Sequence, residues 1–175
     1  MTAALGGLSA GAVRLEAQSA TAPELTAAFL FNFVKFTTWP ADVLPGGSPI
    51  VVCVGGDDWV ADSLLQLTRN KAVEGHPLSV RRTNLDRPLD ECHVMYAAAL
   101  DLARAQQLIR AATGHSILTV TDWPDFARRG GVANFFMEGD RMRFAVNPAA
   151  ADRARLRISS NLLTLAMIVR DDGRP

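Results

Sequence analysis

Short apolar runs alternate with helix-forming segments over residues 50–121, and this alternation restricts the fold more than any other feature of the chain. Ile50 to Gly55 (IVVCVG) is a continuous β-branched run of strand length, the pattern of a strand buried on both faces. Three further strands are predicted at 78–83, 92–98 and 116–121, with helices at 59–69 and 101–112. The alternation favours an α/β fold in which a doubly wound, mostly parallel sheet carries helices on both faces.

The pattern changes after residue 121. Residues 132–137 and 141–147 are two predicted strands separated by Glu-Gly-Asp, which indicates a hairpin. This C-terminal antiparallel hairpin would extend the parallel sheet. Pro148 begins a short predicted helix, and a last helix is predicted at 161–170.

An aromatic-rich segment precedes the first strand: Ala27 to Pro40 reads AAFLFNFVKFTTWP. A helix is predicted from Pro23 to Trp39, because Pro40 disfavours the α conformation at the residue before it. The apolar residues at helical spacing, which we expect to pack on the sheet, are Leu25, Phe29, Phe33 and Phe36.

Phe31 lies roughly 160° from the Leu25/Phe29/Phe33 stripe on a helical wheel. One interpretation is a core helix with a stray aromatic, since scattered surface apolars are normal. The other is that part of the helix is a docking surface. The candidate partner-surface residues are Phe31, Lys35 and Trp39, together with Trp123 after the fourth strand. Each is equally explained as core or rim.

Length and charge narrow the classes of protein. A chain of 175 residues is most simply one domain, placed here at residues 23–175. Its 18 basic and 18 acidic residues balance, and no Lys/Arg block occurs, which argues against a nucleic-acid partner. No window of 18 uninterrupted apolar residues occurs, so the chain is not expected to span a membrane.

Residues 1–22 stand apart as an export-signal remnant or a disordered tail. Residues 2–13 are small and apolar like an export h-region, and Ala20-Thr21-Ala22 fits a signal-peptidase site, although a positive n-region is missing.

Motifs for catalysis or cofactor binding are not found. The turn Gly55 to Trp59 is neither GxGxxG nor a P-loop, the three histidines match no zinc spacing, and no GxSxG elbow occurs. We therefore expect no catalytic, cofactor-binding or metal-binding residues, and a protein that is not an enzyme. The enzyme alternative would rest on fold analogy alone. A small-molecule crevice at the strand carboxyl ends, near Gly56, Ala98 and Asp122, is an alternative function.

The two cysteines, Cys53 and Cys92, leave two possibilities open. In a cytosolic protein they would usually be independent buried thiols, whereas in an exported protein a disulfide is favoured.

Several segments occur in a recognisable order. AAFLFNFVKFTTWP is followed by VVCVGGDDW, ECHVMYAA, SILTVTDWPDFARRGGVANFFMEGDRMRFAVN and LRISSNLLTLA. Together they resemble the YfiR family of small periplasmic proteins (also described as a DUF4154 domain), whose members carry a similar aromatic helix ending in Trp-Pro. The resemblance runs from residue 23 to residue 170, nearly the whole chain.

The resemblance implies a periplasmic regulatory binding protein. It would repress a membrane-bound diguanylate cyclase, or a sensor kinase, through the periplasmic sensor region of that partner. The family also implies sequestration by an outer-membrane lipoprotein, a homodimer, and a disulfide at positions matching Cys53 and Cys92. Some members have a second disulfide, which this chain, with two cysteines, does not carry.

Overall fold

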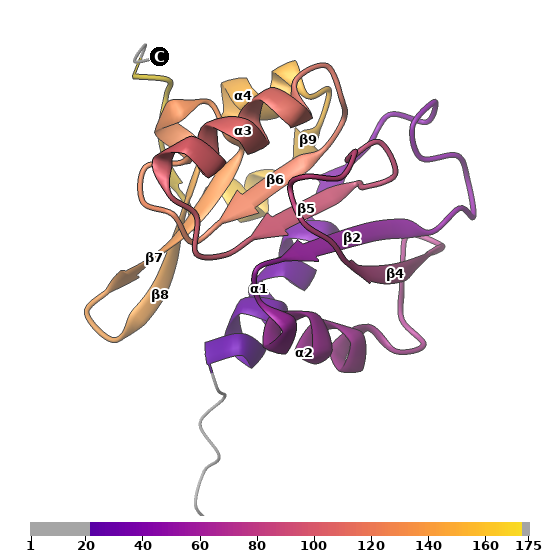
Figure 1. The fold of residues 1–175 in the computed structure, drawn as a ribbon. Helices are drawn as coiled ribbons and strands as arrows, with labels where there is room; N and C mark the ends of the chain where they lie inside the picture. Colours follow the sequence, from indigo (N-terminus) through magenta and orange to yellow (C-terminus); the bar gives the residue numbers. More distant parts are fainter. Residues whose placement is uncertain (1–21, 173–175) are drawn as a thin grey trace, which may run out of the picture.

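The computed structural model describes residues 22–172 (Figure 1). The predicted export remnant or tail therefore lies, except for Ala22, outside the described residues. The helices are α1 (Ala22–Lys35), α2 (Asp58–Thr68), α3 (Leu102–Ala112), α4 (Pro148–Arg153) and α5 (Ser160–Leu163), with a 3-10 turn at Ala127–Arg129. The longer strands are β2 (Ile50–Gly55), β4 (His76–Arg82), β5 (Val94–Ala97), β6 (Leu118–Thr121), β7 (Ala133–Glu138) and β8 (Arg141–Val146). The two-residue strands are β1 (Thr37–Thr38), β3 (Ala72–Val73), β9 (Arg157–Ile158) and β10 (Met167–Ile168).

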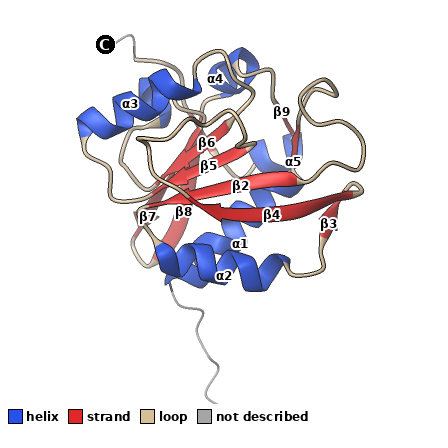
Figure 2. Cartoon of the chain, turned by 45° about the vertical axis from the view of Figure 1, so that its right-hand side comes forward, coloured by secondary structure: helices blue, strands red, loops and turns tan. Residues whose placement is uncertain are grey.

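The main sheet has eight strands in the order β10-β8-β7-β6-β5-β2-β4-β3. Strands β4, β2, β5, β6 and β7 run parallel, and β8 turns back antiparallel to β7 through the predicted hairpin, with Glu138 paired to Arg141. Helices α1 and α2 cover one face, and α3 and α4 the other (Figure 2). The predicted fold class, a doubly wound and mostly parallel sheet with a C-terminal antiparallel hairpin, is confirmed.

Two aspartates cap the helices that follow strands β2 and β5. Asp57 accepts a hydrogen bond from the Val60 amide at 3.1 Å, and Asp101 accepts one from the Arg104 amide at 2.8 Å. Each carboxylate satisfies an amide that has no partner inside the first helical turn.

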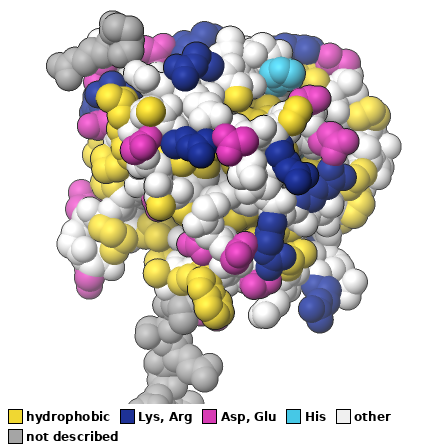
Figure 3. All heavy atoms as spheres, viewed as in Figure 1, with side chains coloured by type: hydrophobic (Ala, Val, Ile, Leu, Met, Phe, Trp, Pro, Cys, Tyr) yellow, Lys and Arg dark blue, Asp and Glu magenta, His cyan; other side chains and the backbone are white. Residues whose placement is uncertain are grey.

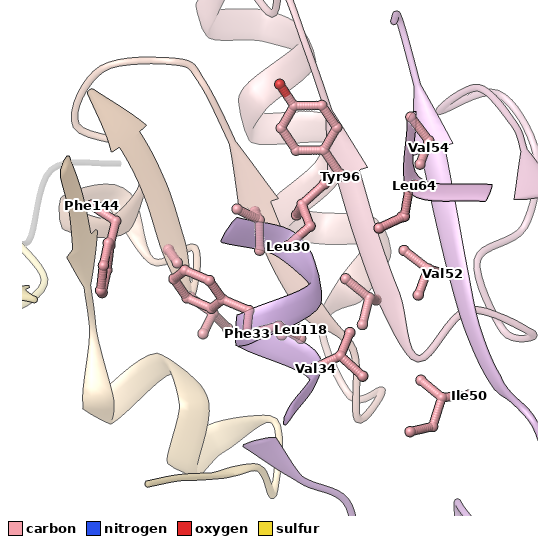
Figure 4. Packing of buried hydrophobic residues seen from close by; sticks show 14 of the residues in the cluster. Leu30, Phe33, Val34, Ile50, Val52, Val54, Leu64, Tyr96, Leu118 and Phe144 are labelled. Atoms are coloured by element: carbon pink, nitrogen blue, oxygen red, sulfur yellow. The ribbon is translucent and has the colours of Figure 1, made fainter. Parts of the chain in front are cut away.

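The larger core lies between α1, α2 and the sheet (Figure 4). The α1 face that is buried carries Thr26, Ala27, Leu30, Phe33 and Val34. Its centre is Leu30, so the predicted stripe is displaced: Phe33 is buried, Phe29 and Phe36 are half-buried, and Leu25 is also only half-buried. Phe29 and Phe31 flank Leu30 by about 100° on either side. Phe31 is therefore a flank of the buried face and not its opposite side.

The first helix ends earlier than predicted, at Lys35 instead of Trp39. Thr37 and Thr38 pair with β9, and the Ser159 amide donates to the Phe36 carbonyl at 2.8 Å. These long-range backbone hydrogen bonds outweigh the helical propensity of residues 36–39. Pro40 therefore restricts only residues that are no longer helical.

The predicted last helix, 161–170, is wrong beyond its first turn. Helix α5 ends at Leu163, and β10 pairs parallel to β8, with the Val169 amide donating to Val146 at 2.9 Å. Of the apolar residues that suggested a helix, Leu162 is buried, whereas Leu165 is 66% and Ile168 50% accessible. Backbone pairing with the unoccupied edge of β8 is therefore favoured over helix formation in this segment.

The crossover from β4 to β5 contains no helix. It passes over β2 on the α3 side, where Leu85 and Leu89 are buried in the smaller core. Cys53 of β2 and Cys92 at the end of this crossover form a disulfide, with their Cα atoms 5.8 Å apart. The pairing implied by the family resemblance is present, and it ties the crossover to the sheet that it covers.

Candidate partner surface

Both lysines of the chain lie near the ring of Phe31. The Lys35 ammonium lies 5.9 Å from the centre of the Phe31 ring, and the Lys71 ammonium lies 5.1 Å from it. Lys35 follows Phe31 by one helical turn on α1, whereas Lys71 lies in the short connection between α2 and β3. Both distances are within the range of cation–π attraction. We call Phe31, Lys35 and Lys71 the lysine surface.

The lysine surface is open and positively charged. Both lysines are exposed, and within residues 22–172 neither is ion-paired with a carboxylate. Together with Phe31 they border a hollow of ≈ 320 Å³, which Ala72, Val73 and Glu74 complete. An aromatic face between two unpaired ammonium groups suits an acidic group on a partner.

Trp39 does not belong to this surface. It is only 6% exposed, and its indole nitrogen donates to the His93 carbonyl at 3.2 Å. This tryptophan joins the segment after α1 to the start of β5. Its role is structural, and little of its side chain is accessible to a partner.

His93 beside it is held as a neutral ring. Its Nδ1 accepts from the Val51 amide at 3.1 Å, which leaves Nε2 to donate to the Val43 carbonyl at 3.4 Å. Burial lowers the pKa of His93, the Val43 carbonyl opposes that shift, and nearby His76 adds to it.

Trp123 lies on the opposite face of the sheet from Phe31. It is half-buried against the smaller core, and the Arg129 guanidinium lies 5.5 Å from its ring centre. The four predicted surface residues therefore do not form one site: Phe31 and Lys35 meet, Trp39 is buried, and Trp123 is separate.

Two surface features were missed from the sequence. Lys71 falls in a connection without helical or strand periodicity, so no local pattern relates it to Phe31. Trp59 on α2 is 76% exposed, the most accessible of the large hydrophobic residues described. Helical periodicity could have predicted this exposure, because Trp59 lies outside the Val60/Leu64 stripe that α2 buries.

The strand carboxyl ends are occupied by backbone at the proposed crevice. The Ala99 amide donates to the Asp122 carboxylate at 3.0 Å. A Cβ placed on Gly56 would lie 2.7 Å from the Ala98 carbonyl oxygen, so the two loops are in close contact. The geometry gives little room for a ligand between Gly56 and Ala98.

Residues 22–172 contain no group of three or more His, Cys, Asp or Glu side chains arranged to hold a metal ion. Within the same residues, no helix is long and apolar enough to cross a bilayer. On the face seen in Figure 3, which runs from α3 at the top to α2 at the bottom, Lys/Arg and Asp/Glu side chains are intermixed.

The described residues form an α/β fold whose α1/α2 side presents the exposed, positively charged lysine surface. The chain belongs to the family described as DUF4154, YfiR/HmsC-like, whose model matches residues 23–167. Proteins of this family are periplasmic regulators of cyclic-di-GMP signalling rather than enzymes, and membership implies this general class of function for the chain.

A solved structure shares the fold. The crystal structure of a conserved domain protein from Vibrio cholerae O1 biovar El Tor strain N16961 superposes with a TM-score of 0.53 at 15% sequence identity. The match covers 85% of this chain and 60% of the Vibrio chain, so this chain spans less than two thirds of that structure. At this identity the likeness concerns the fold alone.

Proposed function

We propose that the protein is a repressor that binds the periplasmic sensor region of an inner-membrane diguanylate cyclase and holds the cyclase inactive. The observation that carries the proposal is the lysine surface, which presents an aromatic ring and two exposed cations, neither of them ion-paired within residues 22–172. A sensor histidine kinase is the second type of membrane partner that this surface would suit.

Repression by binding sets a thermodynamic condition. The repressor must bind the inactive conformation of the cyclase more tightly than the active one, because a ligand with equal affinity for both shifts nothing. An outer-membrane lipoprotein that bound the repressor would then release the cyclase by mass action. A homodimer of the repressor is compatible with this scheme.

The test begins with a membrane pull-down that uses this protein as bait under oxidising and reducing conditions. We expect a membrane diguanylate cyclase or histidine kinase to be enriched, and its purified periplasmic region to bind directly. Recovery of neither class of membrane protein would contradict the proposal.

Variants then test the surface. Phe31→Ala should weaken binding to the purified periplasmic region by about 2 kcal/mol, roughly thirtyfold, if the ring is a central contact. Lys35→Glu combined with Lys71→Glu should slow association and reduce its dependence on salt. Arg87→Glu, an exposed charge reversal on the other face, is the matched control and should bind as the wild type does. If direct binding persists unchanged in all variants, the partner uses another surface.

A further inference from the structure

A cavity of ≈ 420 Å³ lies on the α3/α4 side of the sheet, at the amino end of β6. It is open to solvent and is lined by the last turn of α3, the loop at 128–130, helix α4 and Asp171. It lies at the opposite end of the strands from the crevice expected near Gly56 and Asp122. Its volume is within the range of about 300–1,000 Å³ that is usual for small-molecule sites.

The floor of this cavity is apolar with one polar group. Ile117, Val132 and Ala150 are 2%, 3% and 4% exposed. Thr119, which is 3% exposed, accepts a hydrogen bond from the Val132 amide at 3.1 Å. Within residues 22–172 its own hydroxyl proton has no protein acceptor. One buried donor is thus left for a bound molecule.

Three arginines line the cavity: Arg128, Arg129 and Arg153. Arg153 is paired with Asp171 at 2.8 Å. Arg128 is only loosely paired, since the carboxylates of Asp125 and Asp172 lie 3.7 and 3.8 Å away, beyond hydrogen-bonding distance.

Arg129 is the least satisfied of the three. Within the described part of the chain it has no ion pair, and its guanidinium lies beside Trp123. A guanidinium carries five donors in a planar fork that matches a carboxylate or a phosphate. Arg128 and Arg129 therefore keep donors available for an anion at the wall of an apolar cavity.

We propose that this cavity is a binding site for a small organic anion. The apolar body of the ligand would lie on Ile117, Val132 and Ala150, and its carboxylate or phosphate would meet Arg128 and Arg129. An inorganic anion would leave the floor unused, and a neutral molecule would leave the guanidinium donors unused.

Calorimetric titration with four probes tests the chemistry: benzoate, phenyl phosphate, benzyl alcohol and inorganic phosphate. At least one of the two aromatic anions should bind about tenfold or more tightly than both benzyl alcohol and inorganic phosphate, because a charge-assisted hydrogen bond is added to apolar burial. Comparison of benzoate with phenyl phosphate distinguishes the two head groups. If neither aromatic anion exceeds benzyl alcohol, or if inorganic phosphate binds equally well, the proposal is overturned.

Variants locate the site. Arg129→Gln should weaken the preferred anion about tenfold, whereas Arg141→Gln, an exposed arginine without an ion pair in the described residues, should leave it unchanged. Ala154→Phe, at a half-buried position of the wall, should occlude the cavity and abolish binding while benzyl alcohol binding falls with it. Thermal melts confirm that each variant is folded. Equal affinities of Arg129→Gln and Arg141→Gln, or undiminished binding by folded Ala154→Phe, would assign the anion to a different place.

Discussion

Gly131 shows how one missing side chain determines local packing. A Cβ at this position would lie 2.0 Å from the Phe126 ring, and Phe126 is completely buried. The requirement is for space and not for an unusual backbone angle, since Gly131 does not have a positive φ. The neighbouring Gly130 has φ 104° and closes the 3-10 turn, so two adjacent glycines serve different purposes.

We expect Gly131→Ala to lower the free energy of unfolding by about 1–3 kcal/mol, the usual cost of overpacking. Urea denaturation measures the loss. Gly46→Ala is the matched control, because a Cβ at Gly46 meets no atom within 4 Å and its φ is not positive. That control should stay within about 0.5 kcal/mol of the wild type. Equal stabilities for the two variants would mean that Phe126 repacks freely.

His93 should make stability depend on pH. Because burial lowers its pKa in the folded protein, the folded state binds fewer protons than the unfolded state. The contribution of neutral His93 to the free energy of unfolding is then fully present above about pH 6.5, the pKa of an unperturbed histidine. It declines as the pH falls toward the lower pKa of the folded state. Protonation would also place a donor against the Val51 amide.

The measurement compares urea midpoints at about pH 7.5 and 5.5, either side of the ordinary histidine pKa. His93→Gln should be less stable at the higher pH but should lose less on acidification than the wild type. His115→Gln, at an exposed histidine, should keep the wild-type decline. An identical decline in the His93 variant would place the titrating group elsewhere.

At the scale of elements, the β4–β5 crossover is held on the sheet by a covalent bond. The other connections between parallel strands contain a helix or the 3-10 turn before β7. Its buried anchors are Leu85 and Leu89, and Cys92 joins it to β2. Closing a segment with a sequence separation of 39 stabilises by about 4 kcal/mol in the chain-entropy model, an upper figure.

Thiol titration of the unfolded, unreduced protein should find no free thiol, and reduction should release both. Cys53→Ser combined with Cys92→Ser should lower the free energy of unfolding by up to about 4 kcal/mol. It should also make the crossover more susceptible to a protease of broad specificity such as proteinase K, as reduction of the wild type should. Two free thiols per chain before reduction would contradict the disulfide.

At the scale of the whole molecule, the two candidate sites lie on opposite faces of the sheet. The lysine surface belongs to the α1/α2 side, and the anion cavity belongs to the α3/α4 side. A macromolecular partner and a small ligand would therefore not compete for space. Any coupling between them would have to pass through the sheet as a change in the protein's conformational equilibrium.

The sequence predicted the parts of the fold that local pattern controls. Buried strands appeared as β-branched runs, and they alternated with helix-forming segments over residues 50–121. The end of α1 and the C-terminal segment were mispredicted because pairing with β9 and β8 decides them, and those partners are distant in sequence. The same limit applies to the sites: Phe31 and Lys35 share one helix, but Lys71 joins them only through the fold, and Arg128 and Arg153 meet the cavity from separate elements.

The ends of the main sheet have a consequence for how the protein recognises others. Its terminal strands, β10 and β3, pair with only two residues of β8 and β4. The remaining edge positions include Arg141 and Arg143 on one side and Arg81 and Arg82 on the other, and charged edges disfavour the addition of a foreign strand. A partner therefore cannot readily bind by pairing its own strand with the sheet edge through main-chain hydrogen bonds, which are independent of sequence. Discrimination among partners would then depend on side chains alone, so a single surface substitution could change which partner is bound.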